Sequence, residues 1–124
     1  MRKFKNKNII MAVKNALVGL KYVFSYHNHF RIELFFALLV IILSYFLNLS
    51  LFEFLFVLLA IFFVLIFEII NTLVEETLDV IDPNYNEKIK IIKDISSGAV
   101  LVAILFSIVV GILIFGKKLL SPIF

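Results

Sequence analysis

Apolar residues recur at helical spacing near the start of the chain. The residues concerned are Ile9, Val13, Leu17, Leu20 and Phe24. At about 100° per residue they fall within about 80° of one another, so they form one face of a helix. Another side of the helix carries Lys7, Lys14 and Lys21. A helix with an apolar and a basic face is typical of the membrane interface, where lysines meet anionic headgroups. The pattern predicts an interfacial helix over about residues 6–27.

A much longer apolar run follows, with one polar break at 48–50. A single helix over 34–67 would be about 50 Å long, whereas the hydrocarbon core of a bilayer is about 30 Å thick. We therefore expect two membrane spans joined by a tight turn, over about residues 30–48 and 52–80. The second span has to continue past Glu68 to reach its end.

A third apolar run predicts one more span, over about residues 95–116, with no charge inside it. Pro83 and Asn84 mark a turn between it and the second span. Residues 96–99 are small, which permits close helix packing in membranes. The fold class predicted is all-α integral membrane, with three transmembrane helices and an N-terminal amphipathic interfacial helix, in a single domain over 1–124.

Composition supports this class and excludes others. Hydrophobic residues make up 63% of the 124 residues, well above the roughly 45–50% of ordinary globular domains. The chain has no cysteine and two histidines, which excludes disulfides, thiolate metal sites and a histidine-based zinc site. The net charge of +3 does not indicate a nucleic-acid partner, because the apolar stripe beside the lysines needs lipid or protein.

The placement of basic residues predicts an orientation. Residues 1–33 hold seven Lys and Arg, and residues 81–94 hold three, whereas only Lys117 and Lys118 follow the last span. With three spans, the first two groups lie on the same side. The positive-inside rule then places the N-terminus and the 81–94 loop in the cytoplasm. We expect a multi-pass protein of the plasma (inner) membrane.

Acidic residues line the end of the second span on one helix face. The members of this acidic face are Glu68, Asn71, Glu75 and Asp79, with Glu76 at its flank. They fall within about 80° of one another around the helix. An ionised carboxylate near the bilayer centre costs about 2.5–3.5 kcal/mol, and the predicted orientation reduces that cost by placing the face near the cytoplasmic interface.

Three interpretations of the acidic face are open from spacing alone. It is a solvated helix end or a structural helix contact, or the ion path of an oligomeric channel or transporter subunit, or a catalytic site. Mg²⁺ usually takes one or two carboxylates together with phosphate oxygens, and a further carboxylate can act as a general base. With Lys93 to neutralise phosphate charge, these parts suit phosphoryl transfer.

The motif also has a known counterpart. It reads Glu68-x₂-Asn71-x₃-Glu75-x₃-Asp79, then Pro83 and Tyr85, then Lys93-Asp94-x₃-Gly98-Ala99-Val100-Leu101. This pattern resembles the small prokaryotic diacylglycerol kinase/undecaprenol kinase family. The resemblance extends upstream through Gly19-Leu20 and Phe30-Arg31 and covers roughly 14–115. The chain has neither a GxxxxGK[ST] nor a GxGxxG motif, in agreement with that family.

The resemblance implies a homotrimer that phosphorylates a membrane lipid alcohol with ATP and Mg²⁺, at sites between subunits. It implies that Glu68 is the general base and that Asn71 places the reacting groups. It implies that Glu75 binds the metal bridging the ATP phosphates and that Lys93 contacts phosphate. Asp79 and Asp94 would shape the nucleotide pocket.

One departure concerns the metal. The family usually has a second metal-binding glutamate ahead of its Phe-Arg pair, and His27 stands at that place. Three roles are open for His27: metal ligand, partner through water, or a residue of the wet interface. Glu33 is close enough to replace the missing carboxylate. The runs at 82–83 and 98–101 favour undecaprenol as the lipid, with diacylglycerol second.

Overall fold

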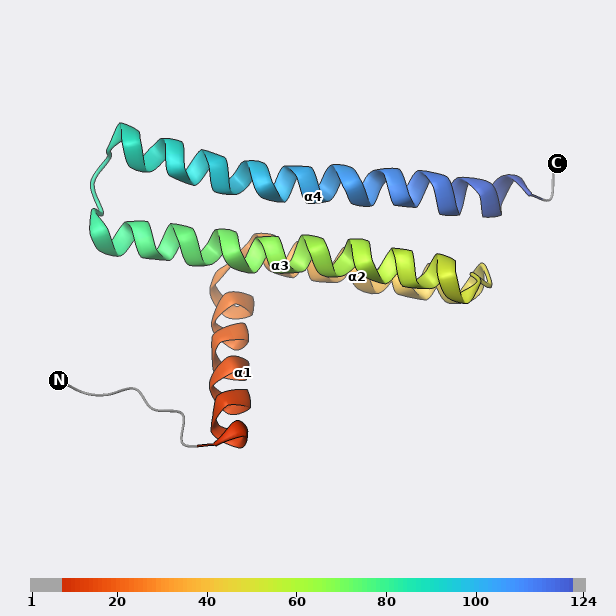
Figure 1. Ribbon diagram of the computed structural model, residues 1–124, viewed down its shortest axis with the longest axis horizontal. Coiled ribbons are helices and arrows are strands. Elements are labelled where there is room, and N and C mark those ends of the chain that lie inside the picture. Colours follow the sequence, from red (N-terminus) through yellow and green to blue (C-terminus); the bar gives the residue numbers. More distant parts are fainter. Residues whose placement is uncertain (1–7, 122–124) are drawn as a thin grey trace.

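The computed structural model of the chain describes residues 8–121, and all of its regular elements in that range are helices (Figure 1). They are α1 (Ile9–Tyr26), α2 (Asn28–Phe46), α3 (Leu51–Ile81) and α4 (Glu87–Leu120). The all-α prediction is thus confirmed for the described residues. All four helices are long and apolar enough to cross a membrane, one more than the three predicted spans.

The helices begin where polar side chains cap them. The Asn8 side chain accepts a hydrogen bond from the backbone of Met11 and caps α1. Ser50 and Glu53 form a reciprocal capping box at the start of α3, which satisfies backbone donors that a helix start leaves unpaired. The turn before it contains Asn48 at φ 51, a left-handed conformation that asparagine tolerates better than most residues.

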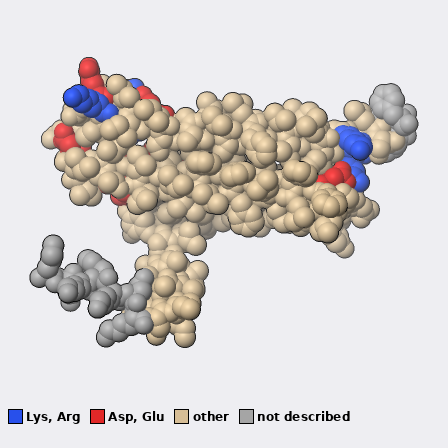
Figure 2. Space-filling view, in the orientation of Figure 1, with Lys and Arg blue, Asp and Glu red and all other residues tan. Residues whose placement is uncertain are grey.

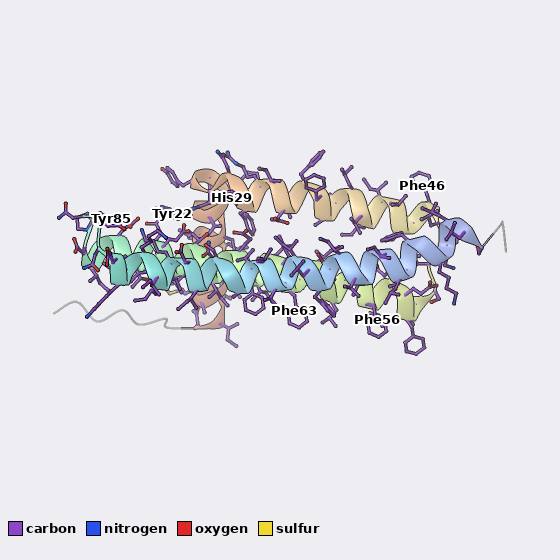
Figure 3. All side chains as sticks on the ribbon, turned by 90° about the horizontal axis from the view of Figure 1, so that it is seen from above. Tyr22, His29, Phe46, Phe56, Phe63 and Tyr85 are labelled. Carbon is purple, nitrogen blue, oxygen red and sulfur yellow. The ribbon has the colours of Figure 1, made fainter. Side chains whose placement is uncertain are left out.

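Helices α2, α3 and α4 run side by side along the long axis, and α1 stands roughly perpendicular to them (Figure 1). Contacts join α3 to α4 most extensively, then α2 to α3. The core is thin: Val57, Ala60 and Val110 form its central cluster. Most large apolar side chains point outward, as Phe56 and Phe63 do on the side away from α2 (Figure 3). Such an outside suits lipid or other protein chains rather than water.

The predicted loop over 81–94 is shorter than expected. Only 82–86 lies between the helices, because α4 begins at Glu87 and not near residue 95. The Asn86 side chain accepts hydrogen bonds from the backbone of Lys88 and Ile89 and caps this earlier start. The start predicted near residue 95 marks the place where charged residues end, whereas the helix already includes the charged residues that precede it. The ends predicted at 27, 30, 48, 52 and 80 lie within about two residues of the helix ends, the usual spread between boundary assignments. The last helix ends at Leu120, four residues after the predicted 116, and the start predicted near residue 6 lies outside the described residues.

Charged side chains gather at the two ends of the bundle, and its middle is apolar (Figure 2). At one end Lys118 pairs with Glu53 at 3.3 Å. At the other end lie the acidic face of α3 and three lysines from the start of α4: Lys88, Lys90 and Lys93. Counted at 1.5 Å per residue, α3 is about 46 Å long and α4 about 51 Å. Both exceed the roughly 30 Å of a hydrocarbon core, so their acidic end reaches beyond it.

Candidate active site

Glu68 is the buried acid of the site, at 7% exposure on α3. It lies 17 residues after Leu51, about 26 Å along the helix, near the far edge of a hydrocarbon core. The charges that act on it come from Glu33, Glu75 and the two histidines. Glu33 therefore lies within electrostatic range of Glu68 on the acidic face. A buried carboxylate among other acids needs a proton, a cation or a substrate to offset the repulsion.

One turn further, Asn71 and Glu75 contact each other. The Asn71 Nδ2 donates to Glu75 Oε1 at 3.3 Å, as their separation of four residues allows on a helix. The Oδ1 of Asn71 is buried and has no hydrogen-bond partner among the described residues. A buried acceptor without a donor costs free energy. This oxygen is therefore available to a cation or to a donor brought by a ligand.

Asp79 and Lys93 join α3 to α4. The Lys93 Nζ lies 2.6 Å from Asp79 Oδ1. Lys93 precedes residue 95, where the uncharged apolar stretch begins, and its hydrogen bond to Asp79 raises the pKa of its ammonium group. The charge of Glu75 also acts on this lysine. Two predicted nucleotide-binding residues are thus brought together, with a third within electrostatic range.

Asp94, the remaining predicted nucleotide-binding residue, pairs within its own helix. Its Oδ2 lies 2.7 Å from Lys90 Nζ, one turn earlier on α4. Both side chains are mostly exposed. Within residues 8–121, no hydrogen bond or ion pair joins Asp94 to the acidic face.

The two residues predicted to bind metal do not contact each other. The His27 Nε2 lies 3.1 Å from Oε1 of Glu76 instead, and the Tyr22 hydroxyl donates to the same oxygen at 3.1 Å. Residues 8–121 contain no group of three or more His, Asp or Glu arranged to hold a metal ion. A metal role for His27 stays a prediction. The Glu75 carboxylate and the free Asn71 Oδ1 are hard oxygen donors, which fit Mg²⁺ when phosphate oxygens complete its shell.

An apolar groove opens beside the acids, between α2, α3 and α4. Its lining runs from Glu33 to Phe115, and the small residues Ala37, Ala60 and Gly111 line it between them. Glu33 is the only charged residue among those described along it. The apolar groove therefore meets the charged groups of the site at Glu33.

The fold and this cluster define a class: an all-helical membrane protein with an acid-rich site at one end of its bundle. The chain belongs to the prokaryotic diacylglycerol kinase family, whose sequence profile matches residues 14–115. A diacylglycerol kinase of Synechocystis sp. is 32% identical over 117 residues, or 94% of this chain and 65% of the relative. An undecaprenol kinase of Bacillus subtilis is 35% identical over 83 residues, or 67% of this chain and 68% of the relative.

The family resemblance predicted from the motif is confirmed by these matches. The chain spans 65% of the length of the Synechocystis relative. The roles assigned to individual residues are not tested by the comparisons and stay predictions.

Sequence reasoning missed the contacts of Glu76, which was placed at the flank of the acidic face. Its partners Tyr22 and His27 come from the corner between α1 and α2. The one available signal was its position about 80° from Glu68 around the helix. That angle shows that Glu76 faces a different neighbour, but not which one.

Proposed function

We propose that this chain catalyses the ATP-dependent phosphorylation of a membrane lipid alcohol to the lipid monophosphate. The observation that carries the proposal is the cluster at the acidic end of α3. There the buried Glu68 lies within electrostatic range of Glu75, and the charge of Glu75 in turn acts on Lys93. Base, cation ligand and phosphate-binding group are the parts that phosphoryl transfer requires.

In the proposed reaction Glu68 accepts the proton of the lipid hydroxyl. The hydroxyl oxygen forms a bond to the γ-phosphorus of ATP, and the bond from that phosphorus to the bridging oxygen breaks to release ADP. The burial of Glu68 keeps bulk water away from the base, so water competes poorly with the alcohol. The groove that begins at Glu33 gives the hydrocarbon chain of the substrate an apolar surface beside the base.

The remaining residues bind and orient the nucleotide. Glu75 and the unpartnered Oδ1 of Asn71 would hold Mg²⁺, with His27 or Glu33 as the further ligand. When bound, this cation neutralises charge on the phosphate oxygens. Lys93, placed by Asp79, would donate to phosphate. Asp94 would stand at the outer edge of the nucleotide pocket.

For the whole chain we infer three spans, α2 to α4, with α1 on the membrane surface, in one domain. The perpendicular direction of α1 supports this arrangement (Figure 1). So does its mean hydropathy of 1.2, against 2.8 and 3.0 for the most apolar windows of α3 and α4. By the positive-inside rule, the basic residues support a cytoplasmic N-terminus and a cytoplasmic 81–94 segment, on the side where ATP and Mg²⁺ are available. The family resemblance adds a homotrimer with sites between subunits.

Undecaprenol is the proposed lipid, with diacylglycerol second, because Asp82-Pro83 and the run 98–101 favour the undecaprenol kinase branch. The test is purified protein in detergent with MgATP and each lipid, with the initial rate of lipid phosphate formation measured for both. A faster rate on undecaprenol supports the assignment, and a faster rate on diacylglycerol reverses it. Protein that phosphorylates neither lipid but conducts ions in liposomes without ATP would be a channel subunit instead.

A further inference from the structure

Glu76 is held by the side chains of Tyr22 and His27. The proposed reaction does not use Tyr22, and it uses His27 only as one of two alternatives for the further metal ligand. The Tyr22 hydroxyl donates to its Oε1, and the His27 Nε2 lies at the same distance, 3.1 Å, from that oxygen. Tyr22 belongs to α1, His27 is the corner residue between α1 and α2, and Glu76 belongs to α3. One carboxylate oxygen thus joins three segments of the chain.

The chemistry of these groups fixes where the histidine proton lies. His27 Nε2 lies within hydrogen-bond distance of a carboxylate oxygen, and such an oxygen accepts hydrogen bonds, so we assign the proton to Nε2 of His27. In the neutral ring, Nδ1 is then the nitrogen with the free lone pair. The Tyr22 hydroxyl has to point its proton at the same oxygen. Glu76 therefore sets both the orientation of the ring and its tautomer.

The corner that this network holds has few other contacts. Val23 is the only buried residue described on α1, and α1 points away from the other three helices (Figure 1). Tyr22 and His29 flank the corner (Figure 3). Directly after it, His29 and Glu33 of α2 act electrostatically on Glu68. The position of the corner thus determines how these charges face the buried acid.

We propose that Glu76 is a positioning residue of the site: through Tyr22 and His27 it fixes the corner between α1 and α2, with the His27 proton on Nε2. Its effect on turnover rests on the proposed lipid kinase activity, whereas its effect on the histidine does not. Partners that orient metal-binding histidines typically contribute about 10–100-fold to metal affinity or activity. We expect Glu76→Ala to lower kcat by that factor, with the KM for ATP nearly unchanged.

The test combines nitrogen NMR of the histidines with kinetics. The chain has two histidines, so a His29→Gln variant assigns the signals of ¹⁵N-labelled His27. At a pH where the ring is neutral, we expect the Nε2–H tautomer in the parent protein and a mixture of tautomers in Glu76→Ala. Glu76→Gln should restore the tautomer and most of the rate, because an amide oxygen accepts both hydrogen bonds.

Two matched controls separate positioning from a general loss of structure. Tyr22→Phe removes one donor, and Tyr26→Phe removes a neighbouring exposed hydroxyl outside the network. The first should lower kcat and the second should not. Glu87→Ala, which removes an exposed acid of α4, should leave both the spectrum and the rate unchanged.

An unchanged His27 spectrum in Glu76→Ala would overturn the proposal, and so would equal rates in Tyr22→Phe and Tyr26→Phe. Should Glu76→Ala fail to fold, the comparison of kcat between Tyr22→Phe and Tyr26→Phe still decides the question. If the parent protein phosphorylated no lipid, the proposed activity would fall while the histidine spectrum still tested the positioning role.

Discussion

Replacing Glu68 by glutamine removes the proposed base with little change in shape. Glutamine has nearly the same volume and helix propensity as glutamate, so the buried position, at 7% exposure, stays filled. An amide cannot take the proton of the lipid hydroxyl. A positioned base typically contributes about 10²–10⁴-fold to rate, which corresponds to about 2.7–5.5 kcal/mol of activation free energy. We expect kcat to fall within that range.

Stability should respond in the opposite direction. Glu68 has the like charges of Glu33 and Glu75 acting on it, and neutralising it removes that repulsion. The thermal midpoint of Glu68→Gln in detergent should equal or exceed that of the parent protein. A slow variant that is also less stable would indicate damaged packing rather than a lost base.

The neighbouring acid provides the matched comparison. Glu33→Gln removes a carboxylate that lies within electrostatic range of Glu68 and lines the apolar groove. Both variants are assayed by formation of radiolabelled lipid phosphate from MgATP, at saturating lipid. We expect the greater loss in Glu68→Gln. A rate of Glu68→Gln within about twofold of the parent protein would refute the assignment of Glu68 as the base, because a lost base costs far more. A greater loss in Glu33→Gln would assign the role of base to Glu33.

Three further outcomes are expected. Asp79→Asn should raise the KM for ATP because Lys93 loses its 2.6 Å partner. The increase should be smaller than the roughly 100-fold that misplacing a reacting group can cost, and initial rates over a range of ATP concentrations measure it. Ala60→Leu should lower stability by about 1–3 kcal/mol, because Ala60 is 4% exposed in the central cluster; a thermal midpoint equal to the parent's would contradict this. The chain has no cysteine, so in intact cells a membrane-impermeant thiol reagent should label Asn48→Cys and spare Asn84→Cys.

The apolar pattern predicted the helices well because an apolar run that crosses a hydrocarbon core of about 30 Å has to be about 20 residues long. The break at 48–50 became a capped turn because Asn48 and Ser50 have the side chains that such a turn requires. The start of α4 was the error. Loss of charge marks the place where a helix enters the apolar layer, whereas Asn86 marks where the helix itself begins. The apolar layer sets the first boundary, and the capping of backbone donors sets the second. The prediction took the place where charge ends for the start of the helix.

The part of the candidate site that lies on a single helix, α3, was predictable from the sequence. The 100° period placed Glu68, Asn71 and Glu75 on a common face, and the structure joins two of them. The approach of Lys93 to Asp79 follows once α3 and α4 form an antiparallel pair joined by a short connection. The contacts of Glu76 were not predictable, because they depend on the direction in which α1 leaves the corner. No period in the sequence specifies that direction.

The distribution of partners along the acidic end of α3 indicates where a ligand is needed. Asp79 has a lysine, and Glu76 has a histidine and a tyrosine hydroxyl. Within residues 8–121, Glu68 and Glu75 form no ion pair, although Glu68 is the more buried of the four acids. Folding alone leaves these two charges without an ion pair and the Oδ1 of Asn71 without a hydrogen-bond partner among the described residues. A cation held by phosphate oxygens would compensate the charges and the oxygen together. For this reason the acids that are least stabilised by the chain are the ones to which the chemistry is assigned.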